Sequence, residues 1–269
     1  MSLNQYLNTN FKTNCLKRFA YVGNRVDFDK KLHYLTTISE PENWYQKEND
    51  DVPPVIFYYI IHTFNRIFEQ EKLEINDTED ICVGNTGLIT PQGDEIYFYF
   101  VKSPTHDPEK ITSNYWYLKK FICENEQDFI RTGLKRPSIA SYFDDYNELF
   151  FDANLKITLN FDHIFGERSE RLPIEFGVLP IDIARQSFNG FLEHTKKRIK
   201  RNNRIPVPQY YKGKIMFLIP VTIFNSKIVV IAVEKIGNEY IANTTLTKTM
   251  AYNCARLLNK PESNWLLIE

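Results

Sequence analysis

The sequence predicts an α+β fold: a mainly antiparallel sheet flanked by helices, with a helical N-terminal region. Apolar and polar side chains alternate over 155–162, and over 94–101 the set Ile96, Phe98 and Phe100 alternates with Tyr97, Tyr99 and Val101, which is the period of a β-strand. Apolar runs follow one another over 214–244 without room for crossover helices, which favours antiparallel pairing. Apolar stripes at helical spacing mark other segments. We therefore expect residues 81–247 to build one sheet.

The first 80 residues are predicted to form a mostly helical region that packs on a core domain of residues 81–269. A helix is expected near 26–38. The acidic segment 40–54 is predicted to be a loop that closes with two prolines, and a second helix follows over 55–72.

The core domain is predicted to begin with a hairpin, in which the turn TPQG joins two strands. Later segments are assigned by their periodicity and by the turns between them. The predicted elements are strands at 81–89, 94–102, 117–125 and 149–165, a helix over 181–202, strands within 214–244, and a helix over 248–259.

Charge is distributed unevenly along a chain whose formal net charge is -1. Residues 182–204 contain seven Lys or Arg and two acidic residues, so 7 − 2 gives a local charge of +5. Such a patch attracts phosphates even when the total charge is near zero. The alternative is a solvated helix end, where cations favour the helix dipole.

The cysteine pattern and the apolar runs exclude several classes of protein. Cys15, Cys82, Cys123 and Cys254 form no CxxC pair, so we expect free thiols and no metal site. The opening residues lack an apolar signal core, and the apolar run at 55–64 is too short to span a bilayer. The sequence thus predicts a soluble, cytoplasmic protein without a membrane partner.

The segment RNNRIPVPQYY carries the strongest indication of a binding site. Arginine is a planar donor suited to phosphate, and the aromatic and amide side chains can stack on a base or hydrogen-bond to it. The two prolines hold the backbone extended. A helix end followed by an edge strand is the alternative. The candidate ligand-binding residues here are Lys196, Lys197, Arg201, Arg204, Gln209 and Tyr211.

Two further segments supply candidates for a shared pocket. In TTLTKTMAYNCARLL, Tyr252 and Arg256 are four residues apart on a face expected to be exposed, and hydroxyl groups at a helix N-terminus suit an anion. An ordinary capped helix explains the pattern equally well. In NTGL, Asn85 begins a turn that can expose N–H groups to phosphate, although a bulge without function is the simpler interpretation.

The stretch LNFDHIF offers the only candidates for acid–base chemistry. Asp162 and His163 can act as a base and its orienting group, or as metal ligands, and Asn160 lies on the polar face of the same predicted strand. The alternative is a turn carboxylate beside a half-buried imidazole. No nucleotide-binding, hydrolase or metalloprotease motif is present, and no cofactor is indicated.

The order of these segments resembles domain-of-unknown-function family 3825. The resemblance rests on NTGL, IYFYF, LFFD…NFDHI, RNNRIPVPQYYKGKIMFLIP and TTLTKTMAYNCARLL…PESNWL, over about residues 81–267. The family commonly has Asn at the position of Cys254 and Asp at that of Thr249, so no role is carried over to those two. Some members are fused to predicted RNA-associated modules, which implies an RNA-linked role without a known reaction.

The sequence therefore predicts a protein that binds RNA or a nucleotide through a basic and aromatic surface. A hydrolase acting on a phosphodiester or nucleotide, with Asp162 and His163 as acid and base, is the alternative. A protein-interaction module is a third function class compatible with the sequence, which specifies no oligomeric state.

Overall fold

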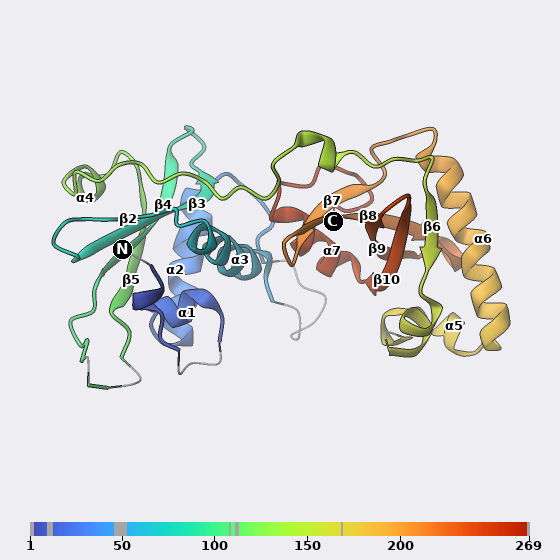
Figure 1. Cartoon of the computed structure of the whole chain (residues 1–269), viewed down its shortest axis with the longest axis horizontal. Coiled ribbons are helices and arrows are strands. Elements are labelled where there is room, and N and C mark those ends of the chain that lie inside the picture. The colour runs from blue at the N-terminus through green and yellow to red at the C-terminus, as the bar shows by residue number, and fades with distance from the viewer. Residues whose placement is uncertain are drawn as a thin grey trace. The chain divides into compact units, whose positions relative to one another are not determined.

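The computed structural model describes residues 3–9, 13–45, 53–107, 109–110, 113–167 and 169–267. Two compact units can be distinguished (Figure 1). The N-terminal unit comprises Met1–Tyr45 and Pro53–Ser141, and the C-terminal unit contains Tyr142–Glu269. Of the loop expected at 40–54, residues 46–52 lie outside the described residues.

The N-terminal unit is built around one five-stranded sheet with the strand order β1-β5-β4-β3-β2. Only the β1–β5 pair is parallel. Its strands are β1 (Ala20–Tyr21), β2 (Leu73–Ile75), β3 (Ile81–Ile89), β4 (Glu95–Lys102) and β5 (Trp116–Cys123). Its helices are η1 (Leu3–Tyr6), α1 (Cys15–Phe19), α2 (Arg25–Ile38), α3 (Val55–Glu69) and α4 (Gln127–Ile130). The domain boundary expected at residue 80 falls inside this unit, between two paired strands.

Helix α3 packs on the sheet through the apolar stripe that the sequence predicts. Phe64 is fully buried, and its ring centroid lies 5.4 Å from that of Phe98 and 5.6 Å from that of Phe100. Gly84 allows the close approach of α3, because a Cβ built there would lie 2.8 Å from Ile67 Cδ1.

The C-terminal unit contains a second five-stranded sheet, with the order β6-β10-β9-β8-β7. Only β6 and β10 pair in parallel. The strands are β6 (Lys156–Leu159), β7 (Val207–Tyr211), β8 (Lys214–Thr222), β9 (Ile228–Ile236) and β10 (Glu239–Leu246). The helices are η2 (Tyr146–Leu149), η3 (His163–Glu167), η4 (Ser169–Arg171), α5 (Ile174–Gly177), α6 (Ile181–Ile199), η5 (Phe224–Ser226) and α7 (Lys248–Arg256).

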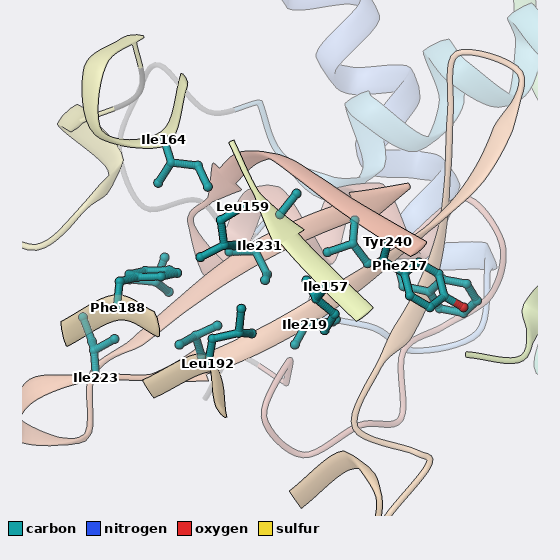
Figure 2. Packing of buried hydrophobic residues seen from close by; sticks show 14 of the residues in the cluster. Ile157, Leu159, Ile164, Phe188, Leu192, Phe217, Ile219, Ile223, Ile231 and Tyr240 are labelled. Carbon is teal, nitrogen blue, oxygen red and sulfur yellow. The ribbon is translucent and has the colours of Figure 1, made fainter. Parts of the chain in front are cut away.

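One face of this sheet forms a core with α6. Phe188 and Leu192 of α6 belong to the same buried cluster as Phe217 and Ile219 of β8 and Ile231 of β9 (Figure 2). Alternate residues point to opposite faces of a strand, so Leu218, also fully buried, lies on the other face. Helix α7 packs against β7 and β9.

The α+β class and the mostly antiparallel pairing are confirmed, but the prediction of a single sheet over 81–247 is wrong. The strands divide into two sheets, with β5 ending the first and β6 opening the second. Alternation shows which side chains are buried, and it does not specify which strands pair. The strand predicted over 149–165 is also shorter: β6 ends at Leu159, and a π-helical turn follows at His163–Glu167.

Candidate nucleic-acid interface

The C-terminal end of α6 concentrates positive charge where the helix dipole favours it. The last turn of α6 contains Lys196, Lys197 and Arg198. Beyond the last helical residue, Arg201 folds back, and its Nη1 donates a hydrogen bond of 2.7 Å to the carbonyl of Lys197. Cations near a helix C-terminus stabilise it by about 0.3–1 kcal/mol. Part of this charge therefore has a structural role.

The positive charge continues past α6 and through the β7–β8 hairpin. Residues 196–214 contain eight Lys or Arg and no Asp or Glu. We call this group of cations, together with the ring of Tyr211, the basic face. Its cations are Lys196, Lys197, Arg198, Lys200, Arg201, Arg204, Lys212 and Lys214.

Some of these cations are engaged by carboxylates from outside the segment. Lys196 Nζ lies 2.7 Å from Glu193 Oε1, and Lys214 Nζ lies 2.5 Å from Glu234 Oε1. Lys197, Lys200, Arg204 and Lys212 are exposed, and no ion pair joins them to an acidic residue in the part of the chain that the structure describes. These four cations are therefore not neutralised by a carboxylate of the described chain.

Strand β7 connects the two groups of cations in the basic face and is the last strand of its sheet, where it pairs with β8 among the described residues. A tight turn follows, in which Lys212 and Gly213 have φ values of +48° and +84°. Two successive residues with positive φ are typical of a type I′ hairpin turn. The turn presents Lys212 at its tip, with Nζ 5.2 Å from the centroid of the Tyr211 ring.

Tyr211 is the exposed aromatic of the basic face, with 46% of its surface accessible. Gln209 was predicted to bind ligand through the same surface. Its side chain is only 2% exposed and therefore does not belong to that surface. Both residues lie on the same side of β7, but Tyr211 is the last residue of the strand and is less covered by its neighbours.

The turn between α6 and β7 is fixed by the C-terminal tail. Trp265 Nε1 donates a 2.8 Å hydrogen bond to the carbonyl of Ile205, and Ser263 Oγ donates one of 3.2 Å to the carbonyl of Arg204. Arg204 therefore projects from an anchored backbone. Trp265, although distant in sequence, thus helps to fix the backbone next to the basic residues.

Helix α7 turns a different face to the core from the one predicted. Tyr252 was expected on an exposed face beside Arg256, but it is only 5% exposed, and Asn253 only 3%. Arg256 and Cys254 are both half-buried. Small residues, Ala251 and Ala255, complete the buried face. Tyr252 is thus not part of an exposed pocket.

Asn85 has a structural role in the N-terminal unit. It is 1% exposed, its Nδ2 donates a 3.0 Å hydrogen bond to the carbonyl of Pro137, and its Oδ1 accepts one of 2.8 Å from Gly87 N. Gly87 has a φ of +72°, and the β3–β4 register shifts between Asn85 and Ile89. The bulge interpretation of NTGL therefore describes this segment. The other candidates belong to the C-terminal unit.

Asp162 and His163 lie where β6 gives way to the π-helical turn. The Asp162 side chain is 92% exposed, and its Oδ1 accepts a 2.7 Å hydrogen bond from Arg185 Nη2. Asn160 Oδ1 accepts from the backbone N–H of His163 at 3.3 Å, and its Nδ2 donates to Asn243 Oδ1 at 3.3 Å. Asn160 therefore links the π-helical turn to β10 through hydrogen bonds, and Asp162 forms an ion pair with Arg185.

Four cations of the basic face were not among the candidate ligand-binding residues: Arg198, Lys200, Lys212 and Lys214. Lys212 is the one at the tip of the hairpin. The signal was present, because a Lys-Gly pair directly after a strand and before another is a hairpin turn, and such a turn exposes its first residue. Lys200, Arg198 and Lys214 complete the charge of the same surface.

The described residues form neither a metal site nor a membrane-spanning helix. No group of three His, Cys, Asp or Glu side chains in these residues could hold a metal ion. Among the helices of the described ranges, none is long and apolar enough to cross a bilayer.

The fold and its surface define an α+β protein with two mixed sheets and a basic edge on the second. Within that class, the chain belongs to the family described as Domain of unknown function (DUF3825), whose model matches residues 35–265. The match extends the resemblance seen in the sequence to α3 and β2. No curated protein and no solved structure matches this chain.

Proposed function

We propose that this chain binds RNA or a nucleotide through the basic face of its C-terminal unit. The observation that carries the proposal is a run of eight cations without an acidic residue, which flanks an edge strand that ends in an exposed tyrosine. Positive charge beside aromatic rings is the combination with which proteins hold single-stranded nucleic acids. The RNA-linked role implied by the family resemblance supports the same function.

The arrangement favours binding over hydrolysis. Asp162 is almost fully exposed and paired with Arg185, whereas a general base works best in a site that shields it from water. Asp162 and His163 therefore enter the proposal only as structural residues of the turn after β6.

Substitutions in the basic face can separate the electrostatic contribution to binding from the contribution of stacking. We expect Arg201→Ala with Arg204→Ala to weaken binding of a fluorescent oligouridylate. The log–log salt slope should fall by about 0.7 for each phosphate that the variant no longer neutralises. Tyr211→Ala should instead cost roughly 1–3 kcal/mol of binding free energy, with the salt slope nearly unchanged.

The matched control is Lys156→Ala on β6, an exposed cation on the opposite edge of the same sheet. It removes a positive charge from the same unit and should leave the affinity unchanged. Wild-type protein that binds neither oligouridylate nor mononucleotides at low salt would end the proposal. Unfolding of the Tyr211→Ala variant would assign the ring to packing instead.

A further inference from the structure

The segment that leads into β6 exposes large aromatic rings among acidic side chains. Residues 144–152 contain four Asp or Glu and no Lys or Arg. Within this segment Tyr146 is 74% exposed and Phe150 is 69% exposed. Aromatic side chains are enriched at protein–protein interfaces relative to the rest of the surface. We call residues 144–152 the aromatic–acidic turn.

Contacts with the second sheet hold both ends of this turn. Before it, the ring centroid of Tyr142 lies 4.9 Å from that of Tyr210 in β7. At its end, the Phe151 ring stacks on Tyr240 of β10 at 4.4 Å, and the backbone N–H of Asp152 donates a 3.0 Å hydrogen bond to the Tyr240 hydroxyl. The exposed rings are therefore presented on an anchored backbone, which reduces the entropy that docking would cost.

One carboxylate of the turn has a structural role, and others are available to a partner. Asp145 Oδ1 accepts a 2.9 Å hydrogen bond from the backbone N–H of Asn147, and its hydrogen bonds to Asn147 lower the pKa of the Asp145 carboxyl. Asp144 and Glu148 are exposed and form no ion pair within the described parts of the chain. These two carboxylates are therefore not neutralised by a cation of the described chain.

The basic face of the same chain has the complementary chemistry. It carries eight Lys or Arg without an acidic residue, and four of these cations meet no carboxylate of the described chain. Lysine and arginine pair with carboxylates, and they are also attracted to the faces of aromatic rings. Among the described residues, no ion pair joins the aromatic–acidic turn to the basic face of its own chain. Both surfaces thus remain open to another molecule.

We propose that the aromatic–acidic turn of one chain docks on the basic face of a second copy of this chain. Carboxylates of the turn pair with cations of the face, and its two exposed rings lie against the same cations. Two different surfaces meet, so each chain keeps one turn and one face free. Head-to-tail contacts of this kind continue into longer assemblies or close into a ring. Exposed ion pairs are individually weak, so the assembly is reversible and sensitive to salt.

This self-association goes beyond the proposed function and places the two in competition. RNA and the turn of a second copy use the same cations. We therefore expect an oligouridylate to disperse the assembly when it occupies the basic face.

The test mixes two variants that each lack one of the two surfaces. In the turn variant, Asp144→Asn is combined with Glu148→Gln, which removes two exposed charges and keeps the shapes of the side chains. In the face variant, Lys200→Ala is combined with Arg204→Ala. Sedimentation velocity at low salt and without nucleic acid should show concentration-dependent assembly of the wild-type chain. Each variant alone should sediment as a monomer over the same concentrations.

An equal mixture of the two variants should form a dimer and nothing larger. The turn variant supplies an intact basic face, the face variant supplies an intact turn, and the resulting pair has no complete surface left for a third chain. All four substituted side chains are exposed, so circular dichroism should show the wild-type fold in both variants. Lys156→Ala, which lies outside both surfaces, should assemble as the wild-type chain does.

Two further measurements separate charge from aromatic contact. Raising the ionic strength from about 0.05 M to about 0.5 M should return the wild-type chain to the monomer, because salt screens exposed charges. Tyr146→Ser and Phe150→Ser should each weaken the association by about two- to fivefold, as expected for the loss of an exposed cation–π contact.

Three results would overturn the inference. They are a wild-type chain that stays monomeric at low salt, a turn variant that assembles as the wild-type chain does, and a mixture of folded variants that remains monomeric. Oligouridylate that binds the wild-type chain without dispersing the assembly would also contradict it. Because the assembly is measured without nucleic acid, a failure to bind oligouridylate would remove the proposed function and leave the self-association standing.

Discussion

Gly84 is the residue on which the packing of the N-terminal unit depends most closely. A Cβ at this position would lie 2.5 Å from Leu73 Cδ2 and 2.8 Å from Ile67 Cδ1, so neighbours in β2 and α3 would have to move. Gly190, in contrast, lies exposed in α6, and nothing would approach a Cβ there within 4 Å.

The same substitution should therefore have opposite effects at the two glycines. We expect Gly84→Ala to lower the free energy of unfolding by about 1–3 kcal/mol through overpacking. Gly190→Ala should raise it by roughly 0.5–1 kcal/mol, because alanine restricts the unfolded chain and favours the helix. Urea denaturation followed by circular dichroism measures both. A neutral Gly84→Ala would show that α3 does not approach the sheet this closely.

The four cysteines are free in the structure, and burial controls their reactivity. Burial raises the pKa of the Cys15 thiol to about 12 and that of Cys82 well above its ordinary value of 9.0. A raised pKa means that the folded state retains the proton. Their contribution to stability is thus fully present below about pH 9 and is lost as the pH rises through the folded pKa values.

Thiol titration tests both the number of free thiols and their burial. We expect four reactive thiols in the denatured, non-reduced protein, and slow reaction of Cys15 and Cys82 in the native protein at mildly alkaline pH. The stability should fall as the pH rises beyond about 9, where the unfolded thiols ionise. Two or zero thiols after denaturation would indicate disulfides, and rapid native labelling of Cys82 would contradict its burial.

Residue-level exposure is where the sequence was least informative about the site. Tyr252 was expected on an exposed face of α7, yet it is buried together with Ala251 and Ala255. Gln209 and Tyr211 occupy equivalent positions of one strand, yet only the second is exposed. Neighbouring elements decide such cases, and periodicity does not describe them.

At the scale of elements, α7 depends on its N-cap. The Thr247 hydroxyl accepts a hydrogen bond from Met250 N at 3.3 Å, with Thr247 in an extended conformation. It thereby satisfies one of the amide groups that a helix leaves without a partner at its start.

Removal of this cap should destabilise the C-terminal unit modestly. We expect Thr247→Ala to cost about 1 kcal/mol of unfolding free energy, and Thr247→Ser, which keeps the hydroxyl, to cost little. Thermal and urea unfolding of the two variants give the comparison. Equal stability of the Ala and Ser variants would mean that the hydroxyl does not cap α7.

Elements with strong periodicity and clear boundaries were predicted well. Helix α3 begins after Pro54 and carries an apolar stripe, and the β3–β4 hairpin has a recognisable turn. The end of β6 was missed because Phe161 and Phe165 continue an apolar pattern into a π-helical turn, where their ring centroids lie 5.9 Å apart. An apolar run does not by itself distinguish a strand from a tightly packed turn.

At the scale of the whole molecule, the two sheets have separate cores, and every cation of the basic face belongs to one unit. The sequence predicted the class of fold, but not the division, because strand pairing depends on contacts between segments far apart in the chain. The cluster of Lys and Arg residues after α6 could be read from the sequence, because the charge of a segment depends only on its own residues. A formal net charge of -1 conceals a concentrated local field.

The most direct test of the central claim is to map where RNA contacts the chain. An oligonucleotide that contains a photoreactive uridine would be crosslinked to the wild-type protein, and the labelled peptides identified by mass spectrometry. We expect crosslinks in the peptides that span Arg204–Lys214, and their loss in Tyr211→Ala but not in Lys156→Ala. Crosslinks confined to the N-terminal unit, or to the turn at Asp162 and His163, would contradict the assignment of the basic face as the binding surface.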